Sequence, residues 1–244
     1  MARKKLASEK NKHFFKKNNN SFSQQNAGKR DMNYLSPFVI SGGERTERFY
    51  FKHISDVTNY KFNIKPKYFG KESNFAVDFP KRIKEIIKNN IDAKIFCVFD
   101  YDTIFNNESN KKNYETFKAK ITTEINSGQV ILCPSMPCIE YWFLLHYINY
   151  NQLIQSCEDV DNFLERYMRS YFSDKKSNFI DILKSEKHLI NPSWVEKLCA
   201  DGKLELAITR AEENIKKAIK ANDLNNQSFS FVYRIFKEYN KKTL

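Results

Sequence analysis

The sequence predicts an α/β protein in which a mainly parallel sheet is flanked by helices and followed by a helical C-terminal region. Up to about residue 150, short apolar segments rich in β-branched and aromatic residues alternate with longer amphipathic segments. Such alternation is typical of parallel strands joined by crossover helices. Only six glycines and six prolines occur in 244 residues, which argues against a turn-rich all-β fold.

Four strands are expected in the first part of the chain. The first is closed by Gly42 and Gly43, and Pro66 places the second near an edge of the sheet. The third is apolar throughout, as a central parallel strand should be. The expected strands are residues 37–41, 61–66, 94–99 and 130–133.

Helices are expected between these strands and throughout the C-terminal part. Proline is favoured at the first position of a helix, so Pro80 is expected to open one of them. No strand is expected after residue 150. Another expected helix begins near Thr46. The others cover residues 111–126, 139–148, 158–172, 176–186, 193–200, 203–221 and 228–241.

The chain is therefore expected to have three parts: a basic, disordered tail over residues 1–33, an α/β domain over 34–150 and a helical region over 151–244. Net charge is +12, and residues 1–30 hold nine lysines and arginines but one acid, so the remaining 214 residues carry only +4. The tail either contacts phosphates through counterion release or serves as a solubilising linker. The tail lysines proposed as nucleic-acid contacts are Lys4, Lys5, Lys16 and Lys17.

The sequence also argues against two other classes of protein. No apolar run reaches the roughly 18 residues that a membrane span needs, and the N-terminal charges are not followed by the apolar stretch of a signal peptide. The five cysteines are odd in number and contain no CxxC pair. A reduced, cytoplasmic protein is therefore expected.

Asp100 and Asp102 follow the third expected strand. Ligands of open α/β sheets lie beyond the carboxyl ends of the strands, so these acids stand where a site is expected. Two carboxylates this close repel each other unless a cation lies between them, and a hard ion such as Mg²⁺ or Mn²⁺ prefers oxygen ligands. The alternative interpretation is a helix cap or a solvated loop.

Two further acidic positions follow other expected strands. Glu44 and Glu47 lie three apart after the first strand, where they serve either a site or the start of a capped helix. Glu140 is the lone acid at the start of an apolar helix, so it caps that helix, reaches the metal site or pairs with a base. His146 falls on another face of that helix and is expected to be a hydrogen-bonded core residue.

At these positions the chain resembles the RloB-like family of bacterial defence proteins, which includes the AbiL abortive-infection component and is itself similar to Toprim-domain nucleases. The resemblance covers about residues 35–215. Its motifs are residues 41–47 with Tyr50 and Phe51, residues 100–102, Pro137, Cys138, Glu140, Trp142 and His146, and a weaker helical match at Ala207, Arg210 and Ala211.

The resemblance implies a Toprim-like fold and a metal-dependent nuclease that cleaves RNA, tRNA included, or DNA as an effector of antiphage defence. It implies Mg²⁺ or Mn²⁺ held by Asp100, Asp102 and Glu44, with Glu47 and Glu140 as further catalytic residues. Arg45 and Arg48 would attract phosphates. An ABC-type ATPase is the implied partner, and homo-oligomerisation is left open.

Gly42 is the most serious departure from the family pattern. The first family motif resembles Cys-Glu-Gly-Glu-x-Thr-Glu, and Gly42 stands at its first glutamate, which corresponds to the Toprim acid. Met136 also stands where the family usually has asparagine. The alternative function is therefore a catalytically impaired Toprim-like module that docks on an ATPase or on nucleic acid.

Overall fold

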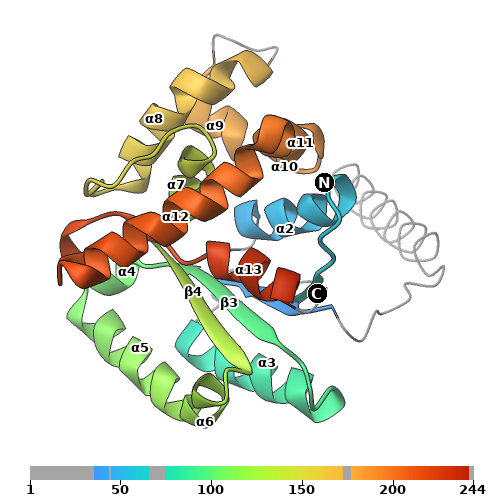
Figure 1. Cartoon of the computed structure of the whole chain (residues 1–244), viewed down its shortest axis with the longest axis vertical. Coiled ribbons are helices and arrows are strands. Elements are labelled where there is room, and N and C mark those ends of the chain that lie inside the picture. Colours follow the sequence, from blue (N-terminus) through green and yellow to red (C-terminus); the bar gives the residue numbers. More distant parts are fainter. Residues whose placement is uncertain (1–35, 44, 66–74, 173–176, 242–244) are drawn as a thin grey trace, which may run out of the picture. The chain divides into compact units, whose positions relative to one another are not determined.

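The structure, a computed structural model, describes residues 36–43, 45–65, 75–172 and 177–241 (Figure 1). The expected tail, with the four lysines proposed as nucleic-acid contacts, lies outside these residues, as does Glu44. From Tyr34 onward the chain forms one unit. No helix in the described ranges is both long and apolar enough to cross a membrane.

A five-stranded mixed sheet lies at the centre of this unit, in the order β2-β1-β3-β4-β5. The first four strands are parallel: Phe38 pairs with Ile95, and Ile95 pairs with Val130. The predictions of a central third strand and an edge position for the second are confirmed. The strands are β1 (Phe38–Ser41), β2 (Asn63–Lys65), β3 (Ile95–Asp100), β4 (Val130–Met136) and β5 (Phe229–Ser230).

The fifth strand corrects the expectation of an all-helical C-terminal region. β5 runs antiparallel to β4, and the hydroxyl groups of Ser135 and Ser230 lie 2.9 Å apart. The helix expected over residues 228–241 begins instead at Tyr233, as α13 (Tyr233–Lys241). A strand of two residues is too short to show an alternating pattern, so only its pairing with β4 reveals it.

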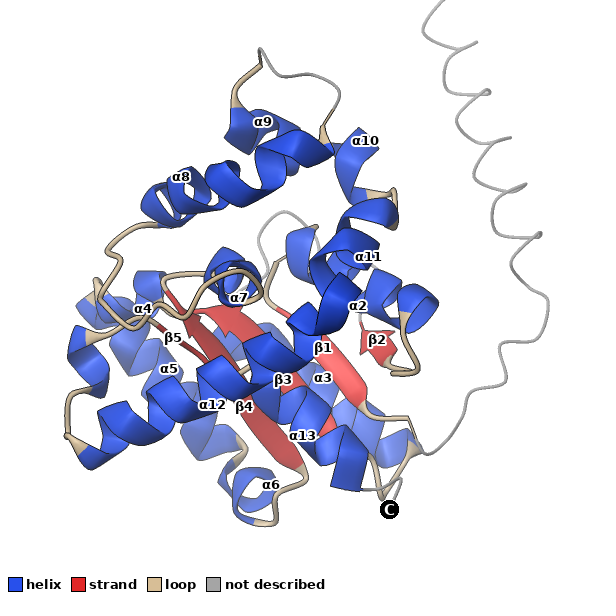
Figure 2. Cartoon of the chain, turned by 45° about the horizontal axis from the view of Figure 1, so that its top comes forward, coloured by secondary structure: helices blue, strands red, loops and turns tan. Residues whose placement is uncertain are grey.

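Helices cover both faces of the sheet (Figure 2). Along β3, Ile95, Cys97 and Phe99 face one apolar core, and Phe96 and Val98 face the other, because successive side chains of a strand point to opposite faces. The first face carries α3 (Phe75–Asn89), α5 (Glu108–Lys120) and α6 (Thr122–Asn126). Pro80 lies inside α3 and does not open it, which corrects the prediction made for it.

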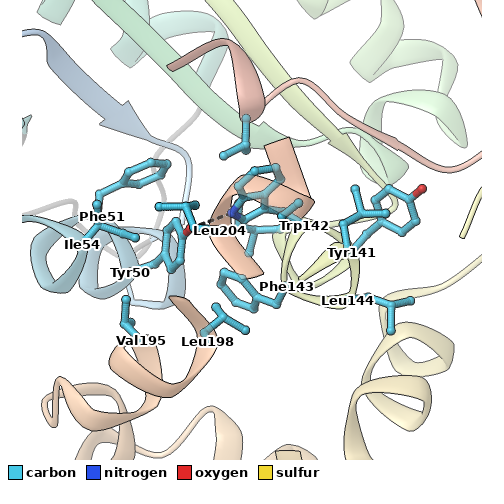
Figure 3. Packing of buried hydrophobic residues seen from close by; sticks show 14 of the residues in the cluster. Tyr50, Phe51, Ile54, Tyr141, Trp142, Phe143, Leu144, Val195, Leu198 and Leu204 are labelled. Carbon is cyan, nitrogen blue, oxygen red and sulfur yellow. Dashed lines mark hydrogen bonds between the residues drawn. The ribbon is translucent and has the colours of Figure 1, made fainter. Parts of the chain in front are cut away.

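The second face carries most of the C-terminal helices, which share their core with α2 (Thr46–Val57) and α7 (Ile139–Leu145). At its centre the indole nitrogen of Trp142 donates a hydrogen bond of 2.7 Å to the hydroxyl of Tyr50 (Figure 3). The remaining helices are α4 (Asp102–Phe105), α8 (Cys157–Met168), α9 (Phe179–Leu183), α10 (Glu186–Leu189), α11 (Ser193–Cys199) and α12 (Lys203–Lys220).

Candidate functional site

Four acidic side chains gather at the carboxyl edge of the parallel strands. Glu47, Asp100 and Glu140 follow β1, β3 and β4, and Asp161 comes from α8. The charge of Glu140 raises the pKa of Glu47, of Asp100 and of Asp161. We call these four residues the acidic cluster.

Glu47 lies in the first turn of α2 and is 4% exposed. Its side chain folds back, so that Oε1 accepts a hydrogen bond of 3.0 Å from the backbone N–H of Gly43. Burial, and secondarily the charge of Glu140, raises the pKa of Glu47 to about 7. A carboxyl with that pKa can accept or release a proton near neutral pH.

The glycines after β1 are there for reasons of space. A Cβ atom on Gly43 would overlap the carboxylate of Glu47, so the observed conformation of the Glu47 side chain requires glycine at position 43. A Cβ atom on Gly42 would lie 3.2 Å from Cβ of Phe99, because the backbone of Gly42 passes close to β3. In this backbone, a glutamate at position 42 needs a displacement of β3 or of the loop.

Asp100 is held by the start of α7. Its Oδ1 atom accepts a hydrogen bond of 2.9 Å from the backbone N–H of Ile139 and so caps a helix that has no side-chain cap of its own. Burial, followed by the charges of Glu47 and Glu140, raises the pKa of Asp100 well above its usual value.

Asp102 has a different environment. It begins α4, and its Oδ1 accepts a hydrogen bond of 2.6 Å from the backbone N–H of Thr103, while its Oδ2 lies 3.8 Å from Sγ of Cys157. Capping, the alternative interpretation of these two acids, is thus observed for Asp100, whereas Asp102 is the first residue of α4, which has no side-chain cap. Cys157 in turn forms a hydrogen bond with Cys138.

Glu140 finds its basic partner in the C-terminal region. Its Oε1 lies 4.0 Å from Nζ of Lys184, which follows α9, and the same Nζ lies 3.1 Å from Oδ2 of Asp161. Glu140 and Asp161 are 4% and 1% exposed, whereas the Lys184 side chain is 40% exposed. Burial, then the charge of Glu140, raises the pKa of Asp161 to about 6.

Lys184 stays charged in this setting. Burial lowers its pKa, but the carboxylates of Glu140 and Asp161 raise it by more, so the pKa lies above its usual value. Sequence reasoning missed Lys184 and Asp161, because both come from the helical region and neither belongs to a motif. The sequence around a single lysine after a short helix does not indicate that this lysine forms an ion pair with a buried acid.

The other predicted contacts are placed as follows. Arg45 is exposed just before α2, and Arg48 is half-buried, with its guanidinium carbon 6.0 Å from the ring centroid of Phe49. All five cysteines are free thiols.

Several residues of the third and fourth family motifs hold the fold together and do not belong to the acidic cluster. His146 is 1% exposed and its Nδ1 donates to the carbonyl oxygen of Leu198 at 2.8 Å, which confirms the prediction of a core histidine. Arg210 of α12 donates to the carbonyl oxygen of Leu145 at the end of α7, at 2.8 Å. These bonds tie α7, which carries Glu140, to α11 and α12.

Carboxylate oxygens are the donors that a hard divalent cation prefers, so the chemistry of the acidic cluster fits such an ion. In the part of the chain that the structure describes, however, no three aspartate, glutamate, histidine or cysteine side chains are arranged around one point as metal ligands. A metal would therefore need the carboxylates to draw closer together.

One comparison with known proteins, that with family models, finds a match. The family model described as RloB-like protein matches residues 38–238, a range that includes the whole acidic cluster. No curated protein and no solved structure matches the chain. The chain belongs to the RloB-like family.

Proposed function

We propose that this protein is a metal-dependent phosphodiesterase that cleaves RNA or DNA. The observation that carries the proposal is the gathering of Glu47, Asp100 and Glu140 from three neighbouring strand ends. Glu47 and Glu140 are buried, Asp100 is half-buried, and the charge of Glu140 raises the pKa of the other two. Burying several acids together costs free energy, and a bound cation would offset that cost. Their place at the carboxyl edge of a parallel sheet is where α/β enzymes bind ligands.

Asp100 and Glu47 would hold Mg²⁺ or Mn²⁺, with Asp102 and Glu44 as the other candidate ligands. When bound, such an ion polarises a phosphate oxygen and lowers the pKa of water. Glu47, with its pKa of about 7 in the metal-free protein, would release its proton when the ion binds. Glu140 is held by Lys184, whose half-exposed ammonium group would meet the phosphate.

The test is cleavage of single-stranded RNA and of plasmid DNA with Mn²⁺ or Mg²⁺, comparing the wild type with Asp100→Asn. This substitution keeps a side-chain oxygen that can accept the bond from Ile139 while it removes the charge. We expect loss of cleavage of at least a hundredfold together with loss of Mn²⁺ binding in calorimetry. Equal, metal-independent activity in both proteins would exclude the proposal.

A second candidate function is supported by Gly42. Position 42 has no carboxylate and is packed against Phe99, and Lys184 already neutralises part of the acidic cluster. Both features suit a Toprim-like module that binds nucleic acid or a partner ATPase without cleaving. Tight nucleic-acid binding by the wild type, with no cleavage under any metal, would favour this function.

The biological role proposed for either function is antiphage defence together with an ABC-type ATPase, and it rests on family membership. Arg45, Arg48 and the tail lysines are the proposed phosphate contacts. Co-purification of the two proteins, with and without residues 1–33, tests the partnership and the part that the tail plays in it.

A further inference from the structure

A pocket of about 340 Å³ lies along one side of α8, next to the segment that leads into this helix. Two aromatic rings, two amide side chains and one charged group of each sign line it. The residues that matter for the argument are Tyr150, Gln155, Asp159, Asn162, Phe163 and Arg166. None of them belongs to the acidic cluster or to a family motif.

The pocket offers flat surfaces on which a planar group can stack. The rings of Phe163 and Tyr150 have their centroids 5.2 Å apart at an angle of 53°, and both residues are half-buried. The guanidinium carbon of the exposed Arg166 lies 5.3 Å from the centroid of Phe163. Aromatic rings and arginine planes are the surfaces on which unpaired bases stack in proteins.

The polar side chains of the pocket suit the edge of such a base. Gln155 and Asn162 are exposed, and each amide provides a donor and an acceptor side by side. Asp159 is held in place, because its Oδ2 accepts a hydrogen bond of 2.6 Å from the hydroxyl of Ser156. These groups can pair with the donors and acceptors of a base edge while its faces are stacked.

The helix that forms the pocket also reaches the acidic cluster. Asp159, Asn162, Phe163 and Arg166 recur at intervals of three and four residues and so share one face of α8, whereas Asp161 lies in the acidic cluster. Cys157 begins α8 and contacts Asp102. Phe163 follows Cys157 by six residues, or about 9 Å along the axis, and it lies two positions after Asp161, so the pocket and the acidic cluster lie on opposite faces of the same helix.

We propose that this pocket binds an unpaired nucleobase of the substrate, on the face of α8 opposite to the acidic cluster. The inference rests on the proposed nucleic-acid function and names its substrate class, single-stranded nucleic acid. In a duplex the faces and pairing edges of the bases are already occupied, so a paired base cannot enter such a pocket without being flipped out.

The test is binding of fluorescein-labelled single-stranded hexanucleotides and a matched duplex by fluorescence anisotropy. EDTA prevents metal-dependent cleavage, and raised salt weakens contacts with the phosphates. The variants are Phe163→Leu, which keeps apolar bulk without the ring, and Phe163→Tyr, which keeps the ring. Phe231→Leu is the matched control, because Phe231 is also half-buried under an arginine, with Arg234 5.5 Å from its ring centroid, but lies outside the pocket.

We expect Phe163→Leu to weaken single-strand binding about fivefold to a hundredfold, the range for loss of one base-stacking contact. Phe163→Tyr and Phe231→Leu should bind within twofold of the wild type. Absence of single-strand binding by the wild type, preference for the duplex, or equal effects of Phe163→Leu and Phe231→Leu would overturn the inference. Because no metal is present, loss of this binding is distinguishable from a failure of the wild type to cleave.

Discussion

The carboxylate of Glu47 folds back over Gly43 so closely that no side chain fits on that glycine. The contact couples a backbone position to the geometry of the acidic cluster. It also allows the placement of Glu47 to be changed without changing the charge of the protein.

Gly43→Ala should displace the Glu47 carboxylate, because the added methyl group takes its space and the glutamate is the flexible partner. We expect the variant to fold and to lose metal-dependent cleavage and Mn²⁺ affinity about as strongly as Glu47→Gln does. Calorimetric Mn²⁺ titration and an RNA cleavage assay measure the effect. Wild-type Mn²⁺ affinity in Gly43→Ala would contradict a role for the folded-back carboxylate.

Glu47 should make the metal-free protein less stable as the pH rises. Its pKa is about 7 in the folded protein against an ordinary value of 4.5, so between these pH values the folded state binds more protons than the unfolded state. Its contribution is therefore complete below pH 4.5 and is lost as the pH rises through about 7.

In EDTA at pH 8, Glu47→Gln should consequently be more stable than the wild type, by on the order of 2–3 kcal/mol. The difference should disappear near pH 4.5. Urea unfolding at several pH values measures it, and a pH-independent difference between the two proteins would show that the carboxyl is not the source.

Lys184 and Asp161 should be energetically coupled. Lys184→Met leaves two buried acids without their cation, and because the lysine is partly exposed we expect a cost of about 1–2 kcal/mol in the free energy of unfolding. Asp161→Asn in the same background should restore part of that loss. A double-mutant cycle measures the coupling, and strictly additive effects would contradict the pair.

Tyr50→Phe should destabilise the protein without altering the acidic cluster. The substitution leaves the buried indole N–H of Trp142 without its acceptor, at a cost of about 1–3 kcal/mol. Thermal unfolding measures the loss. Mn²⁺ affinity below the unfolding temperature should stay unchanged, and a reduced affinity would mean that the Tyr50–Trp142 bond also positions the site.

The sequence by itself determined the layered α/β fold and the strand ends at which Glu47, Asp100 and Glu140 stand. Those features depend on local periodicity, since an apolar segment of β formers and an amphipathic segment show their type within a few residues. β5 escaped for the same reason, because it has two residues. The start of α3 was misplaced because this helix continues through Pro80 against the local preference of proline.

Only the tertiary structure decided how the site is completed. The partner of Glu140 is Lys184, 44 positions along the chain, and it arrives with Asp161 because α8 and α9 pack near α7. The same packing sets Cys157, at the start of α8, beside Asp102. A buried charge pairs with whichever opposite charge lies near it in the folded protein. Which distant segments lie near each other depends on how the helices pack on the sheet, and no local sequence pattern predicts that packing.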